Sequence, residues 1–256
     1  MTAKPVYIQI PNRGLITVSG HDSFHFLQGL ITNDIRLLET QKAIYTCLLT
    51  PNGKFLFDFF VIRDGENLLL ECEGGHRAQD LLKRLQIFKL RADVSFHIED
   101  KKGIYAVFHS KVDFADPRHP EMGHRSFSRP DNMEEAAFDL WDTKRIKLGI
   151  ADGSRDMIPE KSTLLECNID QFNGVSFDKG CYMGQELTAR MHYRGLTKKT
   201  LLPLEFTGTP PAPLTDLKDQ DDQLIGEMRS SCAQFGLALL KKSNLSFVSD
   251  EYKLYS

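Results

Sequence analysis

The 256-residue sequence has no apolar run close to the roughly 20 residues that a membrane-spanning helix requires. Its first ten residues show neither the pattern of a secretory signal nor that of an Arg- and Ser-rich transit peptide. Neither sign of charge is in large excess, because 32 Lys and Arg oppose 35 Asp and Glu and leave a net charge of −3. We therefore expect a cytoplasmic protein that binds neither a membrane nor, directly, nucleic acid.

Cysteine is sparse, and its pattern argues against a disulfide-stabilised domain and against a structural zinc domain. The five cysteines are Cys47, Cys72, Cys167, Cys181 and Cys232, an odd number without a C-x-x-C pair. This pattern favours free, mostly buried thiols over a disulfide framework or a structural zinc site. His21 and His25 have the spacing of a two-histidine metal pair, but no third ligand is evident. We therefore predict no metal site.

The first half of the chain has alternating signals for antiparallel strands and two helices. A strand is predicted at 15–18, followed by a helix capped by Asp22 or Ser23. Two β-rich runs at 43–50 and 54–63 are joined by Pro51-Asn52-Gly53, which predicts a hairpin. The remaining predicted elements are a strand at 67–72, a helix at 76–89 and strands at 94–98 and 104–109. This order indicates an α+β fold.

The second half predicts two helices and a small β domain. Asp131 or Asn132 is expected to cap a helix with Glu134 and Glu135 in its first turn and Trp141 on its apolar face. A shorter helix is expected to end near Arg194-Gly195. Residues 207–223 are rich in Pro and Asp and predict a surface loop, and 224–255 predict the short strands of a barrel or sandwich.

The most unusual segment lies around Cys181, between Gly180 and Gly184. Glycine lets the backbone turn tightly and come close to a ligand. Lys179 and a helix N-terminus just after the segment would favour the thiolate, the form that acts as a nucleophile or metal ligand. A packed structural cysteine is the alternative interpretation, and spacing alone does not separate the two.

Polar residues continue from this segment into the predicted helix. Gln185 and Glu186 lie at its start, where backbone amide groups are free to bind polar groups. Arg190 and Arg194 are four residues apart and could together bind a carboxylate or phosphate. Two solvated arginines on an exposed face would give the same pattern, so both interpretations stay open.

The run KGCYMGQE at 179–186 resembles the signature of the folate-binding YgfZ family, and four further segments support this resemblance. These are FLQGLITNDI at 26–35, LLTPNGKFLFDFFVIR at 48–63, RIKLGI at 145–150 and GEMRSSCAQFGLALL at 226–240. The likeness covers nearly the whole chain. It implies the fold of the glycine-cleavage T-protein, in which three domains form a ring around a channel that binds tetrahydrofolate.

The resemblance also implies a division of the chain and a set of partners. Residues 1–45 with 132–195 would form the first domain, 46–131 an inserted ferredoxin-like α+β domain, and 196–256 a small β-barrel. The protein would be a bacterial, cytoplasmic monomer that binds tetrahydrofolate or a derivative. It would assist assembly or repair of iron–sulfur enzymes, tRNA-modifying ones included, with Cys181 as the functional thiol and a possible transient contact with a cluster.

The loop residues Lys179, Gly180, Tyr182, Gly184, Gln185, Glu186, Arg190 and Arg194 would shape or assist this thiol, and Asn33 and Asp58 are candidate folate contacts. In the T-protein the hairpin carries two adjacent aspartates, and Phe57 and Asp58 hold those positions here. Phe57 cannot exchange a proton, so aminomethyl transfer would lose its acid or base. A folate-dependent one-carbon transferase and a non-catalytic scaffold for client enzymes are the alternatives.

Overall fold

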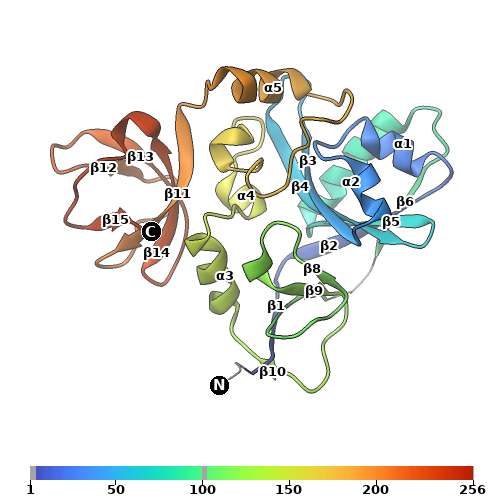
Figure 1. The fold of residues 1–256 in the computed structure, drawn as a ribbon, viewed down its shortest axis with the longest axis horizontal. Coiled ribbons are helices and arrows are strands. Elements are labelled where there is room, and N and C mark those ends of the chain that lie inside the picture. The colour runs from blue at the N-terminus through green and yellow to red at the C-terminus, as the bar shows by residue number, and fades with distance from the viewer. Residues whose placement is uncertain (1–3, 100–102, 256) are drawn as a thin grey trace.

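The computed structural model describes residues 4–99 and 103–255. It has three antiparallel-rich sheets of five strands each, joined by short helices (Figure 1). The expected α+β class is confirmed. None of the helices in these two stretches is long and apolar enough to cross a membrane.

The largest sheet has the strand order β3-β4-β5-β2-β6, with all neighbours antiparallel. Its strands are β2 (Arg13–Ser19), β3 (Ala43–Leu49), β4 (Phe55–Asp64), β5 (Asn67–Glu73) and β6 (Ser95–Glu99). Helices α1 (Ser23–Gln28) and α2 (His76–Lys89) cover one face, where Leu27, Leu81 and Leu85 are buried. The other face is also buried, which explains why β3 has no exposed position.

A second sheet has the order β10-β1-β7-β9-β8. It consists of β1 (Val6–Gln9), β7 (Tyr105–Phe108), β8 (Phe114–Ala115), β9 (His124–Ser126) and β10 (Glu134–Glu135). The expected helical first turn at Glu134 and Glu135 is therefore wrong. These residues pair in parallel with β1, and the Glu135 carboxylate accepts a hydrogen bond of 2.8 Å from the Tyr7 hydroxyl, so tertiary pairing overrides the local helix signal.

The third sheet is the C-terminal barrel, with the order β12-β13-β14-β11-β15. Its strands are β11 (Lys199–Phe206), β12 (Asp216–Lys218), β13 (Leu224–Cys232), β14 (Phe235–Lys241) and β15 (Tyr252–Leu254). The segment 207–223, predicted as a loop, contributes the short strand β12. In Figure 1 the barrel lies on one side of the molecule, with α3 (Phe138–Lys147) and α4 (Gly153–Asp156) between it and the other two sheets.

Arg145 of α3 is the fully buried residue that joins these parts. Its Nε and Nη1 donate to Asp142 Oδ1 at 2.6 Å and to Asp156 Oδ2 at 2.7 Å. Its Nη2 donates to Ser230 Oγ of β13 at 2.8 Å, and Nη1 also reaches the Ile150 carbonyl. One guanidinium thus bonds α3, the α4 segment and the barrel.

The sheets do not follow the predicted domain boundaries. The boundary after residue 45 falls within β3, and β1 and β2, close in sequence, belong to different sheets. The division of the chain into three domains at those residues stays a prediction.

Candidate functional site

The segment before α5 (Gln185–Arg194) is held against α1 by a buried lysine. Lys179 Nζ donates to the carbonyl oxygens of Gln28, Ile31 and Asn33 at 2.7, 2.7 and 2.9 Å. Carbonyls at and just after a helix C-terminus lack helical partners and attract a cation, so the ammonium closes this end of α1. Burial nevertheless lowers the Lys179 pKa to about 8, while Asp34 acts in the opposite direction.

Tyr182 and Met183 complete this attachment. Tyr182 is buried, which raises its pKa to about 12, and the Lys179 ammonium lies 5.1 Å from the centre of its ring. The Met183 amide donates to the Gly29 carbonyl at 3.1 Å. The residues on both sides of Cys181 are therefore fixed to the body of the protein.

Gly184 and Gly53 explain how the hairpin reaches this segment. Gly184 has φ +80°, and a Cβ there would overlap the Thr50 carbonyl and lie 2.9 Å from Leu49 Cβ. Gly53, in the hairpin turn, has φ +78°, and a Cβ there would lie 2.6 Å from Leu187 Cβ of α5. Two glycines thus let the β3–β4 turn lie against the start of α5. Gly180 has open space around it and does not share this constraint.

Cys181 is exposed at the middle of this anchored segment, which we call the Cys181 loop (residues 178–184). All five cysteines are free thiols, as predicted; Cys47, Cys72 and Cys167 are buried and Cys232 is half-buried. Burial raises the pKa of the Cys72 and Cys167 thiols to about 12. The thiol that solvent and a partner can reach most readily is therefore that of Cys181.

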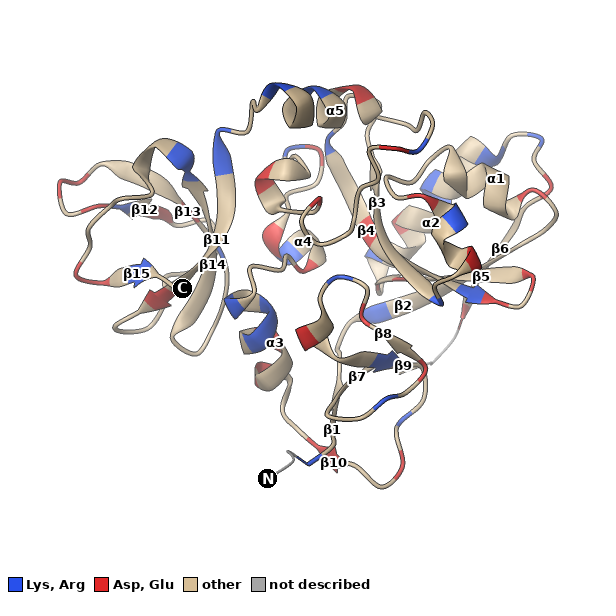
Figure 2. Ribbon diagram, viewed as in Figure 1, with Lys and Arg blue, Asp and Glu red and all other residues tan. Residues whose placement is uncertain are grey.

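The other predicted residues of this region lie on α5 and mostly face solvent. Arg190 forms an ion pair with Glu186, one helical turn away, and a ligand shared with Arg194 stays a prediction. Gln185 begins the helix, and Arg194 is exposed in its last turn. The basic neighbour expected for Cys181 is also placed differently, because the Lys179 ammonium is directed into the carbonyls of the α1 end. Figure 2 shows basic residues along α5 and the segment after it.

The two candidate folate contacts line two of three neighbouring hollows, which we together call the channel. Its mouth is a hollow of about 350 Å³ lined by Asn33, Leu37, Gln41, Ile44, Tyr45, Pro117, Asn173, Val175 and Ser176. The Asn33 amide braces this mouth, because its Nδ2 donates to the carbonyls of Tyr45 at 2.9 Å and Asn173 at 2.7 Å. The Asn33 amide group therefore holds the shape of the mouth, and its Nδ2 donors are already bonded to the protein.

Asp58 is buried and lines the enclosed centre of the channel. Its Oδ2 accepts a bond of 2.9 Å from the Tyr45 hydroxyl. Its Oδ1 has no hydrogen-bond partner among the described residues. Phe57 points to the opposite face, where the Arg77 guanidinium covers its ring at 4.1 Å. The two adjacent side chains therefore lie on opposite faces of β4, and the Asp58 carboxyl faces the centre of the channel.

The centre of the channel is filled by a buried ionic network that sequence analysis did not predict. It is enclosed by Ile10, Arg13, Asp58, Phe60, Arg118, Arg125, Trp141 and Asp152, and the space between them is too small for a water molecule. Arg13 and Arg125 both pair with Glu71, and Arg118 pairs with Asp116. A separate hollow of about 150 Å³ shares Ile10, Arg13 and Asp152 with this centre. The sequence did contain one signal of this network, because Glu71 is a charged residue within a strongly apolar strand.

Burial raises the Asp58 pKa to about 6, while Arg13 acts in the opposite direction. Because the folded-state pKa lies above the ordinary value of 3.8, the native protein binds this proton more tightly than the unfolded chain does. The contribution of Asp58 to the free energy of unfolding therefore falls as pH rises from about 4 to about 6.

We compare the free energy of unfolding of Asp58→Asn with that of the wild type. As pH rises from 4 to 7, we expect this difference to shift in favour of Asp58→Asn by up to about 3 kcal/mol. Urea unfolding of both proteins across this range measures the change in their difference. A difference that stays constant with pH would show that Asp58 ionises as readily in the folded protein as in the unfolded chain.

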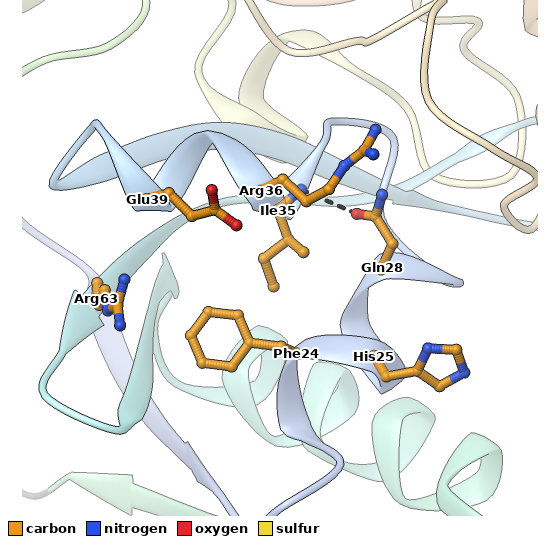
Figure 3. Close-up of a pocket in the computed structure, with 7 residues that line it drawn as sticks. All are labelled: Phe24, His25, Gln28, Ile35, Arg36, Glu39 and Arg63. Atoms are coloured by element: carbon orange, nitrogen blue, oxygen red, sulfur yellow. Dashed lines mark hydrogen bonds between the residues drawn. The ribbon is translucent and has the colours of Figure 1, made fainter.

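Another hollow, of about 430 Å³, lies beside α1 and outside the channel. Phe24 and Ile35 point into it, and Arg36, Glu39 and Arg63 stand around it (Figure 3). Gln28 also lines it, and the carbonyl of the same residue accepts a bond from Lys179. This hollow is thus a neighbour of the Cys181 loop, but it contains none of the predicted site residues.

Comparison with solved structures agrees with this architecture. Aminomethyltransferase T of the glycine cleavage system from Bartonella henselae superposes with a TM-score of 0.71 over 94% of this chain and 79% of its own, at 14% identity. Residues 198–252 match the family model of the CAF17 C-terminal beta-barrel domain. The expected T-protein fold with a C-terminal barrel is confirmed.

Three sequence relatives share one description. The human iron–sulfur cluster assembly factor IBA57, mitochondrial, is 30% identical, with 91% of this chain and 76% of the relative covered. The homologue from Pyricularia oryzae is 30% identical, with 92% and 71% covered. For the homologue from Mycosarcoma maydis, 32% identical, the chain spans 58% of the relative's length.

These relatives correct the expected location, because their names describe mitochondrial proteins of eukaryotes and point away from the bacterial cytoplasm. They also refine the resemblance noted for the KGCYMGQE segment. The chain belongs to the IBA57 family of iron–sulfur cluster assembly factors.

Proposed function

We propose that this protein is an accessory factor for the assembly or repair of iron–sulfur proteins, with Cys181 as its functional thiol. The observation that carries the proposal is an exposed cysteine in a loop whose flanking residues are buried and hydrogen-bonded. Thiolates are the usual protein ligands of iron–sulfur clusters. An exposed thiol can meet a cluster or a cysteine on a partner protein, which a buried one cannot.

The attachment of the loop is what distinguishes this thiol from a cysteine on a mobile surface segment. Lys179 and Tyr182 hold the backbone on the two sides of Cys181, so the thiol has a defined position before a partner arrives. Preorganised groups bind or react with less loss of conformational entropy. The partners we propose are iron–sulfur client enzymes, tRNA-modifying ones included, or the assembly proteins that supply them, with transient contact between Cys181 and a cluster.

Replacing Cys181 by alanine tests the proposal in a strain that lacks the gene. We expect Cys181→Ala to leave iron–sulfur enzyme activity at the level of the deletion strain, because no other cysteine is so exposed. Cys232→Ala is the matched control, and we expect it to restore activity as the wild type does. Circular dichroism and the amount of protein establish that both variants fold.

Full activity with Cys181→Ala would contradict the proposed role of the thiol. It would favour the scaffold alternative, in which the protein binds clients without using a cysteine. If Cys181→Ser still binds client proteins but does not restore iron–sulfur enzyme activity, client binding and the function of the thiol are separate.

We also propose that the channel mouth binds tetrahydrofolate or a derivative. The mouth offers amide groups of Gln41 and Asn173, a hydroxyl of Ser176 and the apolar side chains of Leu37 and Val175. Ligand sites for flat heterocycles usually combine such apolar walls with a few polar groups. The centre of the channel, in contrast, does not fit the pteridine ring, because its side chains leave no room for a water molecule.

One observation favours the alternative of a folate-dependent one-carbon transferase. Asp58 has a pKa of about 6 and an unpaired oxygen, and a carboxyl with these properties can serve as an acid or base near neutral pH. A general base must lie within hydrogen-bonding reach of the proton that it removes. Since the centre has no space for a substrate beside Asp58, the accessory role has the better support.

A further inference from the structure

Arg118 is a buried residue that adjoins both the channel mouth and its enclosed centre. Its neighbour Pro117 lines the mouth, and its own guanidinium lines the centre with Asp58. The guanidinium carbon is 5.5 Å from the centre of the Tyr45 ring, 5.0 Å from that of Phe60 and 5.9 Å from that of Trp141. Three aromatic rings therefore surround the position that this side chain fills.

The ion pairs of the network show which of its arginines can be substituted with the least disruption. Arg13 and Arg125 both bind the buried Glu71, so removing either one changes a shared pair in the sheet. Arg118 bonds to a carboxylate of its own segment, with Nε and Nη2 at 3.0 and 2.8 Å from the oxygens of Asp116.

Asp116 has a second partner, Arg125, at 3.2 Å. It would keep an ion pair without Arg118, which limits the cost of leaving a buried charge unpaired.

We infer that Arg118 divides the channel, so that a ring bound at the mouth is separated from the Asp58 carboxyl. The inference rests on the proposed folate-binding function and adds to it a reason why the protein would bind the ligand without acting on it. With the Arg118 side chain removed, the mouth and the centre would form one cavity walled by Tyr45, Phe60 and Trp141. That cavity suits a flat ring with a polar edge, and Asp58 would lie at its end.

The test is a calorimetric titration of the full-length protein with tetrahydrofolate. We expect Arg118→Ala to bind about tenfold more tightly than the wild type, a gain of about 1.4 kcal/mol, because the ring can enter the centre. Arg118→Met, which keeps most of the bulk, should bind as the wild type does. Arg36→Ala is the matched control, since Arg36 also pairs with an aspartate two residues before it, but on the surface.

Asp58→Asn supplies the second measurement, and its result in the wild-type background does not depend on how well the Arg118 variants fold. In the wild-type background it should leave tetrahydrofolate affinity unchanged, because the ring does not reach residue 58. In the Arg118→Ala background it should remove the tenfold gain. A large loss of affinity in Asp58→Asn alone would overturn the inference, and so would unchanged or weaker binding by Arg118→Ala.

Guanidinium ion gives a readout that is independent of folate. At millimolar concentration it should raise the melting temperature of Arg118→Ala, by occupying the vacated position, and should not raise that of the wild type or Arg36→Ala. Suppose that neither the wild type nor any variant binds tetrahydrofolate, but guanidinium raises the melting temperature of Arg118→Ala. The folate proposal then fails, and the conclusion that the Arg118 side chain divides the channel stands. If tetrahydrofolate binds the wild type, Arg118→Ala binds it no more tightly and guanidinium has no such effect, the inference fails while the proposed function survives.

Discussion

Replacing Arg145 by alanine is expected to lower the free energy of unfolding by about 4 kcal/mol. The guanidinium is fully buried and bonds to Asp142, Asp156, the Ile150 carbonyl and Ser230. Removing one partner of a buried ion pair leaves the other charge without compensation in a medium of low dielectric constant. Asp142 would keep Arg155 as a partner, so most of the loss should come from Asp156 and Ser230.

Urea unfolding of Arg145→Ala, followed by circular dichroism, measures this loss. Arg190→Ala is the matched control, because Arg190 also pairs with an acidic residue of its own helix but is exposed, and we expect a change below about 1 kcal/mol. If both substitutions lower the free energy of unfolding equally, the buried bonds of Arg145 stabilise the protein no more than an exposed ion pair does. The fluorescence of Trp141, which lies 6.0 Å from the Arg145 guanidinium carbon, should also change if the α3 core loosens.

Gly184→Ala is expected to destabilise the protein by about 3 kcal/mol and to displace the Cys181 loop. The left-handed backbone conformation at φ +80° costs an alanine about 1 kcal/mol more than a glycine. The new Cβ would also overlap the Thr50 carbonyl, and relieving such overlap costs about 1–3 kcal/mol. The turn of the β3–β4 hairpin would have to move away from α5.

Gly180→Ala lies in the same loop, and its Cβ would meet no atom within 4 Å. It should change the free energy of unfolding by less than about 0.5 kcal/mol. Unfolding curves and the rate of Cys181 alkylation by a thiol reagent compare the two variants. Equal stability and equal alkylation rates would show that the loop does not depend on its contact with the hairpin.

The local elements of this fold were predictable from the sequence, whereas many of their long-range partners were not. The turn Pro51-Asn52-Gly53 predicted the hairpin correctly, and the helix signal at 76–89 predicted α2, because both signals are short-range. Glu134 and Glu135 resembled a helical first turn. They form a strand instead, because β1 offers a pairing partner from more than a hundred residues earlier in the chain.

The site divides in the same way. Cys181 and its glycines stood out as a motif, and the structure places the thiol at the surface. Arg118 had no motif, since its importance comes from Tyr45, Phe60 and Trp141, three residues scattered along the chain. Lys179 was assigned to the thiol because it is close in sequence. Its ammonium binds α1 carbonyls instead, and α1 lies about 150 residues away along the chain.

The placement of β1 has a consequence for the order in which a ribosome can complete this fold. Its partners β7 and β10 end at Phe108 and Glu135, whereas the sheet that contains β2 is complete once Glu99 has been made. Strand β1 therefore has no pairing partner until these later segments have been made, while the neighbouring sheet can already form around β2. The barrel, whose strands all lie between Lys199 and Leu254, has no such delay and can close as soon as it leaves the exit tunnel.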